Sequence, residues 1–361
     1  MFTTKLLTRF VTIATVLVLA LSGISPAFAA GNDNFADATQ ITSLPYSTNA
    51  DNSIATMEVG EPYPNCGGGY TPLSVWYSYT PSTTTSLTAR VNYNNFPPIV
   101  AVYTGSSLNN LTQIGCSQYY YNTTFQAQAG TTYYFQVSGY YDFYQGIIPF
   151  SLDVTPPPTA GICFGPSDPS IFDTMQFNDC SSDPGGMGFQ SFTWNFGDGT
   201  TLTTTSCCVN HQYAADGDYT FQHTVTTVDG RTDSTSLVIH VRTKDIAITT
   251  FSVPQTAKVN QTKTINVNIQ NKRYSDYVQV TLIKGLPGGG EQVIGTLTIY
   301  VPAKAKQATT FKFSYTFTSD DAKIGKVTFK AVATIASGRD ALPADNTSIA
   351  TTKVSGGVSY P

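Results

Sequence analysis

Alternation of apolar and polar residues is the clearest pattern along the chain. It is most regular in three runs: Ile265-x-Val267-x-Ile269, Val278-x-Val280-x-Leu282 and Phe311-x-Phe313-x-Tyr315-x-Phe317. Because successive side chains of a strand point to opposite faces, each run predicts a strand with one buried face. Dense β-branched and aromatic runs at 74–79, 99–103 and 131–137 predict further strands.

Two breaks divide this pattern. The sequence Thr-Pro-Pro-Pro-Thr at 155–159 must be extended, since consecutive prolines fix φ and favour polyproline II. A second boundary falls near 243–245, where one apolar run ends and Ile246-x-Ile248 begins another. We therefore predict domains at 30–155, 161–243 and 244–355, with a proline-rich linker at 156–160 and a tail at 356–361.

Composition points to the same fold class. The chain has 22 tyrosines and 21 phenylalanines, which favour strands. Only three residues are glutamate, which favours helices: Glu58, Glu61 and Glu291. We predict an all-β protein of three consecutive β-sandwich domains of the jelly-roll or Ig-like kind.

The N-terminus has the pattern of a secretory signal peptide. Lys5 and Arg9 precede an apolar run at 10–21 and the small-residue stretch Pro-Ala-Phe-Ala-Ala at 26–30, which predicts a signal peptide over 1–29. The alternative is a retained membrane anchor. No later apolar run approaches the ~18 residues of a second span, so we expect a soluble, secreted mature chain, with the periplasm or cell surface as other destinations.

The net charge of the mature chain limits the classes of partner that it is expected to bind. Without Lys5 and Arg9, 17 basic residues remain against 23 acidic ones, a net charge of about −6. No basic cluster stands out, so neither nucleic acid nor an anionic membrane is expected as a partner.

Six cysteines fall into two groups, and export makes disulfides the default state. Cys66 and Cys116 can pair only with each other if pairing stays within a domain. The middle group allows three connectivities, which the sequence leaves open, among Cys163, Cys180, Cys207 and Cys208. A zinc site is the alternative, but no CxxC pair or suitably spaced His supports it.

The middle segment carries the most specific motif, Phe-Thr-Trp-Asn-Phe-Gly-Asp-Gly-Thr at 192–200, followed by His-Gln-Tyr at 211–213 and Asp-Tyr-Thr at 218–220. This segment is similar to the PKD domain, a seven-stranded Ig-like sandwich. By alternation Phe192, Trp194 and Phe196 should enter the core, and the Gly-Asp-Gly sequence should form a turn. Tyr213 and Tyr219 should be buried anchors.

The flanking segments carry further resemblances. Asn-Asp-Asn-Phe-Ala-Asp-Ala at 32–38, Ser-Val-Trp-Tyr at 74–77 and Ala-Val-Tyr-Thr-Gly at 101–105 resemble the bacterial pre-peptidase C-terminal (PPC) type domain. An Asp-rich loop usual in that family is replaced here by 116–121, which speaks against a family-type calcium loop. The last segment resembles CARDB-type adhesion domains through Ile-Gln-Asn at 269–271 and Ala-Leu-Pro-Ala-Asp-Asn-Thr at 341–347.

No catalytic constellation emerges, and we expect no enzyme. His211, His223 and His240 lie in none of the nucleophile-elbow or zinc-protease motifs. His223 alternates with core aromatics and should be a hydrogen-bonded core residue. Most aspartates stand in turn sequences such as Asp-Gly.

Calcium is the metal that we consider as a candidate ligand, because loop aspartates supply the hard oxygen ligands that it prefers. Four such residues are expected near one end of the PKD-like sandwich: Asp168, Asp173, Asp179 and Asp183. No other cofactor is expected.

A surplus of aromatic rings gives the candidate binding surface. Its residues are Tyr119, Tyr120, Tyr121, Tyr140, Tyr141 and Tyr144, with Phe143 in the same run. Alternation can bury only half of such a run, so several rings should face solvent, where they suit stacking on carbohydrate or contact with protein. The alternative is a second core face or a domain interface.

Three functional classes follow from these features. The first is an exported binding or adhesion module that contacts polysaccharide or extracellular protein. The second is an accessory or substrate-targeting protein of a secreted hydrolase system, since PPC-like and PKD-like domains commonly accompany such enzymes. The third is a structural surface spacer.

Overall fold

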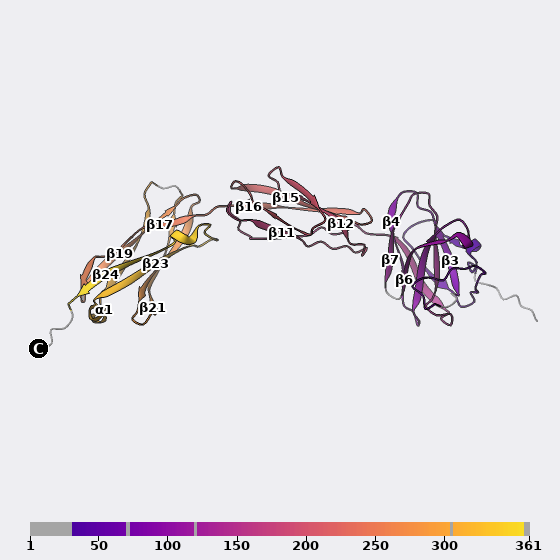
Figure 1. The fold of residues 1–361 in the computed structure, drawn as a ribbon, viewed down its shortest axis with the longest axis horizontal. Coiled ribbons are helices and arrows are strands. Elements are labelled where there is room, and N and C mark those ends of the chain that lie inside the picture. The colour runs from indigo at the N-terminus through magenta and orange to yellow at the C-terminus, as the bar shows by residue number, and fades with distance from the viewer. Residues whose placement is uncertain (1–30, 70–72, 119–120, 304–305, 357–361) are drawn as a thin grey trace, which may run out of the picture. The chain divides into compact units, whose positions relative to one another are not determined.

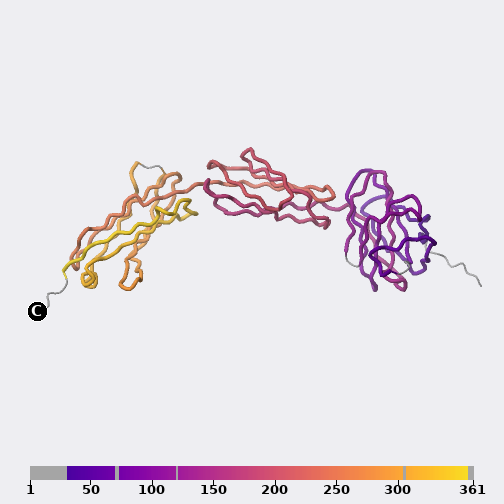
Figure 2. Tube along the Cα trace, viewed as in Figure 1, coloured from indigo at the N-terminus to yellow at the C-terminus, as the bar shows by residue number. Residues whose placement is uncertain are grey.

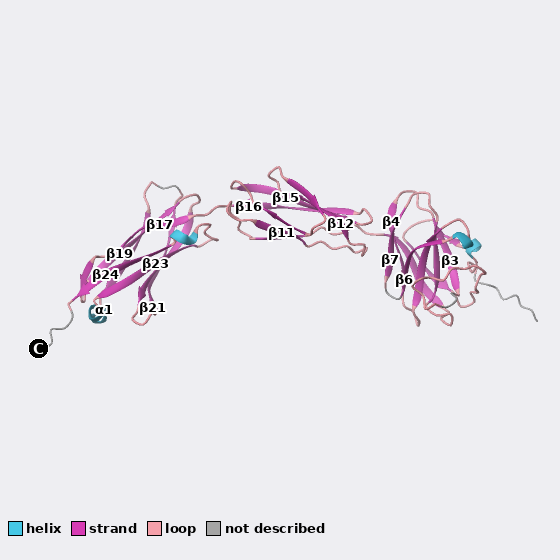
Figure 3. Cartoon of the chain, in the orientation of Figure 1, coloured by secondary structure: helices cyan, strands magenta, loops and turns pink. Residues whose placement is uncertain are grey.

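The computed structural model describes residues 31–69, 73–118, 121–303 and 306–356 (Figure 1). The predicted signal peptide and the candidate residues Tyr119 and Tyr120 lie outside these ranges. The described chain is almost entirely β-strand, with one α-helix, α1 (Ser319–Ile324), and three short 3₁₀ helices (Figure 3). This confirms the all-β prediction. Within the same residues, no helix has both the length and the apolar character needed to cross a membrane.

The chain divides into two compact units. The first comprises the described residues up to 158 with the short segments 183–188 and 227–231, and the second comprises the other described residues. The described residues form six sheets, and the three largest hydrophobic clusters each lie between two of them.

Two sheets face each other in residues 39–154. One has the order β1-β3-β8-β5-β6, with bounds Thr39–Gln40, Ser74–Tyr79, Tyr133–Gly139, Pro98–Thr104 and Thr112–Gln118. The other has the order β2-β9-β4-β7, with bounds Tyr46–Asp51, Ile147–Val154, Thr85–Val91 and Asn122–Ala127. Only the pairing of β1 with β3 is parallel within these two sheets.

Strand alternation builds the core between these sheets. In β9, Ile148, Phe150 and Leu152 are at most 1% exposed and pack inward. The residues between them therefore lie on the outer face of the sheet, which leaves that face polar. A second small cluster around Trp76 and Tyr103 packs on the outer side of the five-stranded sheet.

The PKD-like segment forms two further sheets. The order β10-β11-β14 has bounds Ile162–Gly165, Met175–Asp179 and Cys208–His211, and the order β13-β12-β15-β16 has bounds Thr201–Thr204, Phe189–Asn195, Gly217–Thr227 and Thr232–Val241. The three aromatic residues predicted to enter the core do so: Phe192, Trp194 and Phe196 are 6%, 0% and 3% exposed. Gly197 has φ +80°, and a Cβ there would lie 2.5 Å from the Thr220 carbonyl oxygen, so the turn requires glycine.

The final pair of sheets lies in residues 246–355, and the path of the chain can be followed along the trace in Figure 2. The order β17-β19-β22 has bounds Ile246–Ser252, Thr262–Asn271 and Thr309–Thr316. The order β18-β24-β23-β20-β21 has bounds Thr256–Lys258, Thr347–Ser355, Lys326–Ile335, Asp276–Gly285 and Glu291–Val301. The alternating runs of the sequence fill this core, confirming the strand prediction. A buried ion pair joins Lys284 to Asp321, and the Tyr315 hydroxyl bonds to both.

Candidate functional site

Several loops of the first unit leave the same end of its five-stranded sheet. Pro98 at the start of β5 pairs with Gly139 at the end of β8, and Ile99 pairs with Gln118 at the end of β6. The loops after β6 and β8 and the loop before β5 therefore emerge together. Since neighbouring strands lie about 4.8 Å apart, the loops that flank β5 start roughly 10 Å from each other. The register thus brings the loop that ends at Tyr121 near residues 140–144.

The second aromatic run is a loop and not a strand, because β8 ends at Gly139 and β9 begins at Ile147. We call residues 140–144 the aromatic loop. The rings of Tyr141 and Phe143 stack with centroids 5.3 Å apart and planes at 11°, and Tyr140 meets Tyr141 edge-on at 4.7 Å. Phe143 is 68% exposed, whereas Tyr140 and Tyr141 are half-buried.

Tyr144 anchors the aromatic loop to the core. Its ring stacks on Phe96 with centroids 5.5 Å apart, and it packs against the hydrophobic cluster between the two sheets. Tyr144 was predicted as a binding residue because alternation along a strand was assumed. In the loop it is half-buried and serves as a support.

A disulfide holds a second loop against the rings. The predicted Cys66–Cys116 bond is present and ties the loop containing Gly68 to β6. The Gly68 N–H donates to the Tyr140 carbonyl at 3.1 Å, and a Cβ at Gly68 would lie 2.7 Å from Cε1 of Tyr141. Only glycine lets the loop approach the ring this closely.

Glu61, near the start of the same loop, fixes it from inside the domain. Its carboxylate is 3% exposed and accepts hydrogen bonds from Nε2 of Gln136 at 2.9 Å, from the Glu58 N–H at 3.0 Å and from the Ser74 hydroxyl. Burial raises the pKa of Glu61, and the hydrogen bonds partly oppose that rise.

Two more exposed rings lie on the loops at this end. Tyr121, after β6, is 71% exposed, and Tyr93, before β5, is 47% exposed. The loop of Tyr93 also holds Asn95 at φ +68°, a left-handed conformation that asparagine tolerates better than most residues. We call the five rings at this end of the sandwich the ring-rich end: Tyr93, Tyr121, Tyr140, Tyr141 and Phe143.

Tyr93 and Phe143 were missed as site residues from the sequence. Phe143 was part of the quoted aromatic run, and its exposure follows from its place in a loop. Tyr93 stands apart from both runs, and only the pairing of β5 with β8 shows that its loop shares their end of the sheet.

The four aspartates considered for calcium do not come together. Asp168 is exposed, Asp173 accepts bonds from the N–H and hydroxyl of Ser170, Asp179 contacts His223, and Asp183 pairs with Arg231. Among the described residues no three His, Cys, Asp or Glu side chains are grouped closely enough to hold a metal ion. Arg339 contacts both Asp168 and Asp173, while Asp179 and Asp183 have separate partners.

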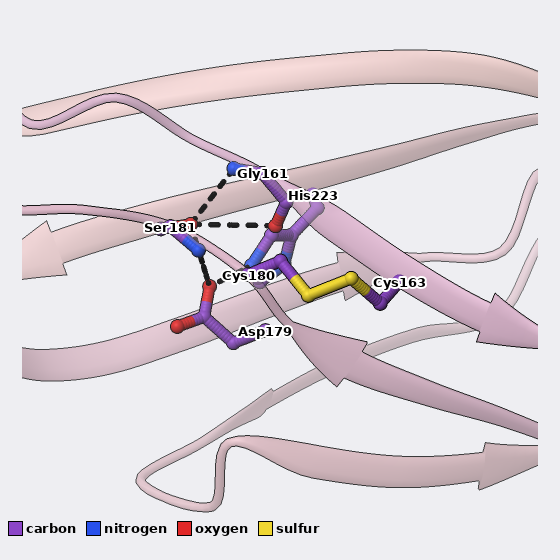
Figure 4. The surroundings of a disulfide bond; sticks show 6 residues. All are labelled: Gly161, Cys163, Asp179, Cys180, Ser181 and His223. Atoms are coloured by element: carbon purple, nitrogen blue, oxygen red, sulfur yellow. Dashed lines mark hydrogen bonds and ion pairs between the residues drawn. A yellow bond between two sulfur atoms is a disulfide. The ribbon is translucent and has the colours of Figure 1, made fainter.

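Figure 4 shows the second disulfide, Cys163–Cys180, which joins β10 to the end of β11. Beside it, Oδ1 of Asp179 accepts a bond from the Ser181 hydroxyl at 2.5 Å and contacts Nε2 of His223 at 3.0 Å. A nucleophilic triad would need the serine hydroxyl on the histidine, but here the carboxylate lies between them. The arrangement is therefore a structural one.

His223 is a core residue, as predicted. It is fully buried, and its ring stacks on Trp194 with centroids 4.0 Å apart. His211 contacts Asp198 and His240 contacts Asp218, each at 2.8 Å. Among the described residues, these three histidines have aspartate partners and none faces a nucleophile.

The expectation that all six cysteines form disulfides is not met. Cys207 and Cys208 are exposed free thiols with sulfur atoms 3.2 Å apart. Cys163 and Cys180 form a disulfide, because the antiparallel pairing of β10 with β11 places their Cα atoms 5.9 Å apart. The two adjacent cysteines take part in neither of the two disulfides that the described residues form.

Comparison with known proteins identifies one segment. No curated protein matches the chain. The PKD1 domain of the Vibrio cholerae metalloprotease PrtV is 26% identical over 24% of this chain and 98% of its own, with a TM-score of 0.21. Fibronectin(III)-like modules of Clostridium thermocellum CbhA are 12% identical over 55% of this chain and 94% of theirs, with a TM-score of 0.30. Residues 156–241 match the family model described as PKD domain, so the chain contains a PKD domain in its middle segment.

Proposed function

We propose that this chain is an exported, non-enzymatic binding module that contacts polysaccharide through the ring-rich end of its first unit. The observation that carries the proposal is the exposure of Phe143 and Tyr121 on loops that leave one end of one sheet. At 68% and 71% exposure, these large rings contribute little buried apolar surface to the core of their own domain.

The support beneath the rings favours recognition over chance exposure. The Cys66–Cys116 disulfide and the close approach of Gly68 to Tyr141 limit the motion of the neighbouring loop. Tyr144 fixes the other side through its stack on Phe96. A pre-organised aromatic surface loses little conformational entropy when a partner binds.

Polysaccharide is the partner class that suits this surface best. Aromatic faces pack against the apolar C–H faces of sugars, and neighbouring amides can bond to sugar hydroxyls. Asn95 lies on the same loop as Tyr93 and supplies such an amide, whereas the Asn94 amide donates to the Ile147 carbonyl at 3.2 Å. A protein partner would use the same rings, and the experiment below separates the two.

Two further features support export and the absence of catalysis. Disulfides are typical of chains that leave the cytoplasm, and the PKD domain together with the signal-peptide pattern fits that destination. The histidines that hydrolases commonly use are paired with aspartates in structural positions.

The test is retention of the purified mature chain on a panel of insoluble polysaccharides and on immobilised matrix proteins. The variant Phe143→Ala/Tyr121→Ala should lose retention on the polysaccharide that holds the wild type. The matched control is Tyr277→Ala/Tyr300→Ala, which removes two rings that are 57% and 51% exposed and 5.5 Å apart in the C-terminal segment. That control should bind like the wild type.

Three results would contradict the proposal. Retention only on matrix proteins would assign a protein partner, and no saturable retention on any surface would favour a spacer. Release of soluble sugar from a bound polysaccharide would show an enzyme.

A further inference from the structure

A polar cleft lies on the outer face of the four-stranded sheet of the first unit. Its volume is about 310 Å³, at the lower end of the range for small-molecule sites. It is lined by Ser47, Thr48, Asn49, Asn92, Pro149, Phe150 and Ser151. These residues come from β2, β9 and the loop after β4.

The strand register arranges the cleft in two rows. Ser47 pairs with Ser151 in one row, and Asn49 pairs with Pro149 in the next. The Asn92 N–H donates to the Pro149 carbonyl at 3.0 Å, which places Asn92 on the other side of the same proline. Two carboxamides therefore flank Pro149, and two hydroxyls lie one row away.

The lining is neutral and its polar groups are uncommitted. Within the described residues, the side chains of Ser47, Asn49, Asn92 and Ser151 make no hydrogen bond to the rest of the protein. Carboxamides and hydroxyls both donate and accept, so they match a ligand whose own groups do both. Arg90, which pairs with Ser151 across the sheet, forms an ion pair with Asp153 at 3.6 Å, and Asp51 lies two residues along β2 from Asn49.

Pro149 adds an apolar contact between the amides. It lacks an N–H and is half-buried, so its ring presents carbon atoms and no hydrogen-bonding group to the cleft. A ligand with hydroxyls at its edges and C–H groups on its face satisfies both parts of this surface.

We propose that this cleft binds one neutral pyranose unit through the side chains of Asn49, Asn92, Ser47 and Ser151. Asn92 begins the loop that continues to Tyr93, so the cleft adjoins the ring-rich end along the chain. As a subsite for a polymer the inference rests on the proposed function. Binding of a free sugar by the cleft does not.

The experiment is an NMR titration of the ¹⁵N-labelled chain with glucose, galactose, mannose and N-acetylglucosamine, taken to the solubility limit. One of these sugars should cause saturable shifts confined to the amides of 47–49, 92 and 150–151. Asn49→Ala/Asn92→Ala should weaken binding about tenfold or more, since two hydrogen-bonding groups are lost. Tyr277→Ala/Tyr300→Ala, which removes two exposed rings in the C-terminal segment, is the matched control and should keep the monosaccharide affinity.

The outcomes separate the cleft from the ring-rich end. Absence of saturable shifts with every sugar, or shifts centred elsewhere, would overturn the cleft proposal. Unchanged affinity in Asn49→Ala/Asn92→Ala would do the same, and so would preferential binding of glucuronate. The proposed function assigns retention on the polymer to Phe143 and Tyr121. If the titration disproves the cleft and Asn49→Ala/Asn92→Ala is still retained on the polymer, the proposed function stands.

Discussion

Loss of the Cys66–Cys116 disulfide should weaken the first unit strongly, and the double variant Cys66→Ser/Cys116→Ser tests this. The bond closes a loop of 50 residues, so without it the unfolded chain gains conformational freedom that the folded chain does not. The loop that approaches Tyr141 would also lose its tether to β6.

The magnitude follows from the length of the closed loop. The chain-entropy relation gives about 4 kcal/mol for a separation of 50, and about 3 kcal/mol for the separation of 17 in Cys163–Cys180. With a urea dependence of about 2 kcal/mol per molar for a domain of this size, 4 kcal/mol corresponds to a midpoint lowered by about 2 M.

The two tryptophans report separately on the first unit and on the PKD domain. Trp76 is fully buried in the first unit and Trp194 in the PKD domain, and the chain has no other tryptophan. In a Trp194→Phe background the emission of Trp76 therefore follows the first unit alone. Urea titrations of the full chain with and without Cys66→Ser/Cys116→Ser give the shift directly.

The control is Cys163→Ser/Cys180→Ser in the same background, which should leave the Trp76 midpoint in place because that bond lies in the second unit. Alkylation before reduction should label only Cys207 and Cys208 in the wild type. A midpoint lowered by less than about 0.5 M, equal to about 1 kcal/mol, would refute the loop-entropy reasoning for this bond.

Two further predictions concern the PKD domain. Trp194→Ala should cost about 3–5 kcal/mol, because it empties a fully buried aromatic site; a circular dichroism melt unchanged from the wild type would contradict this. At Asp229, burial opposes ionisation but hydrogen bonds from Arg231 and other donors outweigh it and lower the pKa from 3.8 to about 2. Its stabilisation, up to about 2 kcal/mol, is present above the unfolded pKa and should be lost as the pH falls through this window. In acid denaturation, Asp229→Asn should lack that part of the pH dependence, and an identical slope would exclude the mechanism.

The strands and the core could be predicted because their signals are local. Alternation placed Phe192, Trp194 and Phe196 in the core, and the same rule buried His223 beside them. The Cys66–Cys116 bond followed from a count of cysteines. Each of these inferences needs only the two-residue period of a strand or the number of cysteines in a domain.

The site needed information that the sequence does not hold locally. Aromatic density made residues 140–144 resemble a strand, whereas the loop frees Phe143 and turns Tyr144 onto Phe96. The meeting of the loops after β6 and β8 depends on a register shared with β5. Likewise, the clustering of aspartates in the sequence predicted a shared calcium site. In the structure these carboxylates instead contact side chains of the protein, such as Arg231 for Asp183.

The central claim is that exposed rings at one end of the first unit bind polysaccharide, and a depletion isotherm on the retaining polysaccharide tests it most directly. The wild type should saturate, and Phe143→Ala/Tyr121→Ala should bind at least about tenfold more weakly, the loss expected for two ring contacts. The Trp76 unfolding midpoint of the variant should stay close to that of the wild type, since both residues are exposed. Superimposable isotherms for the two proteins would contradict the claim.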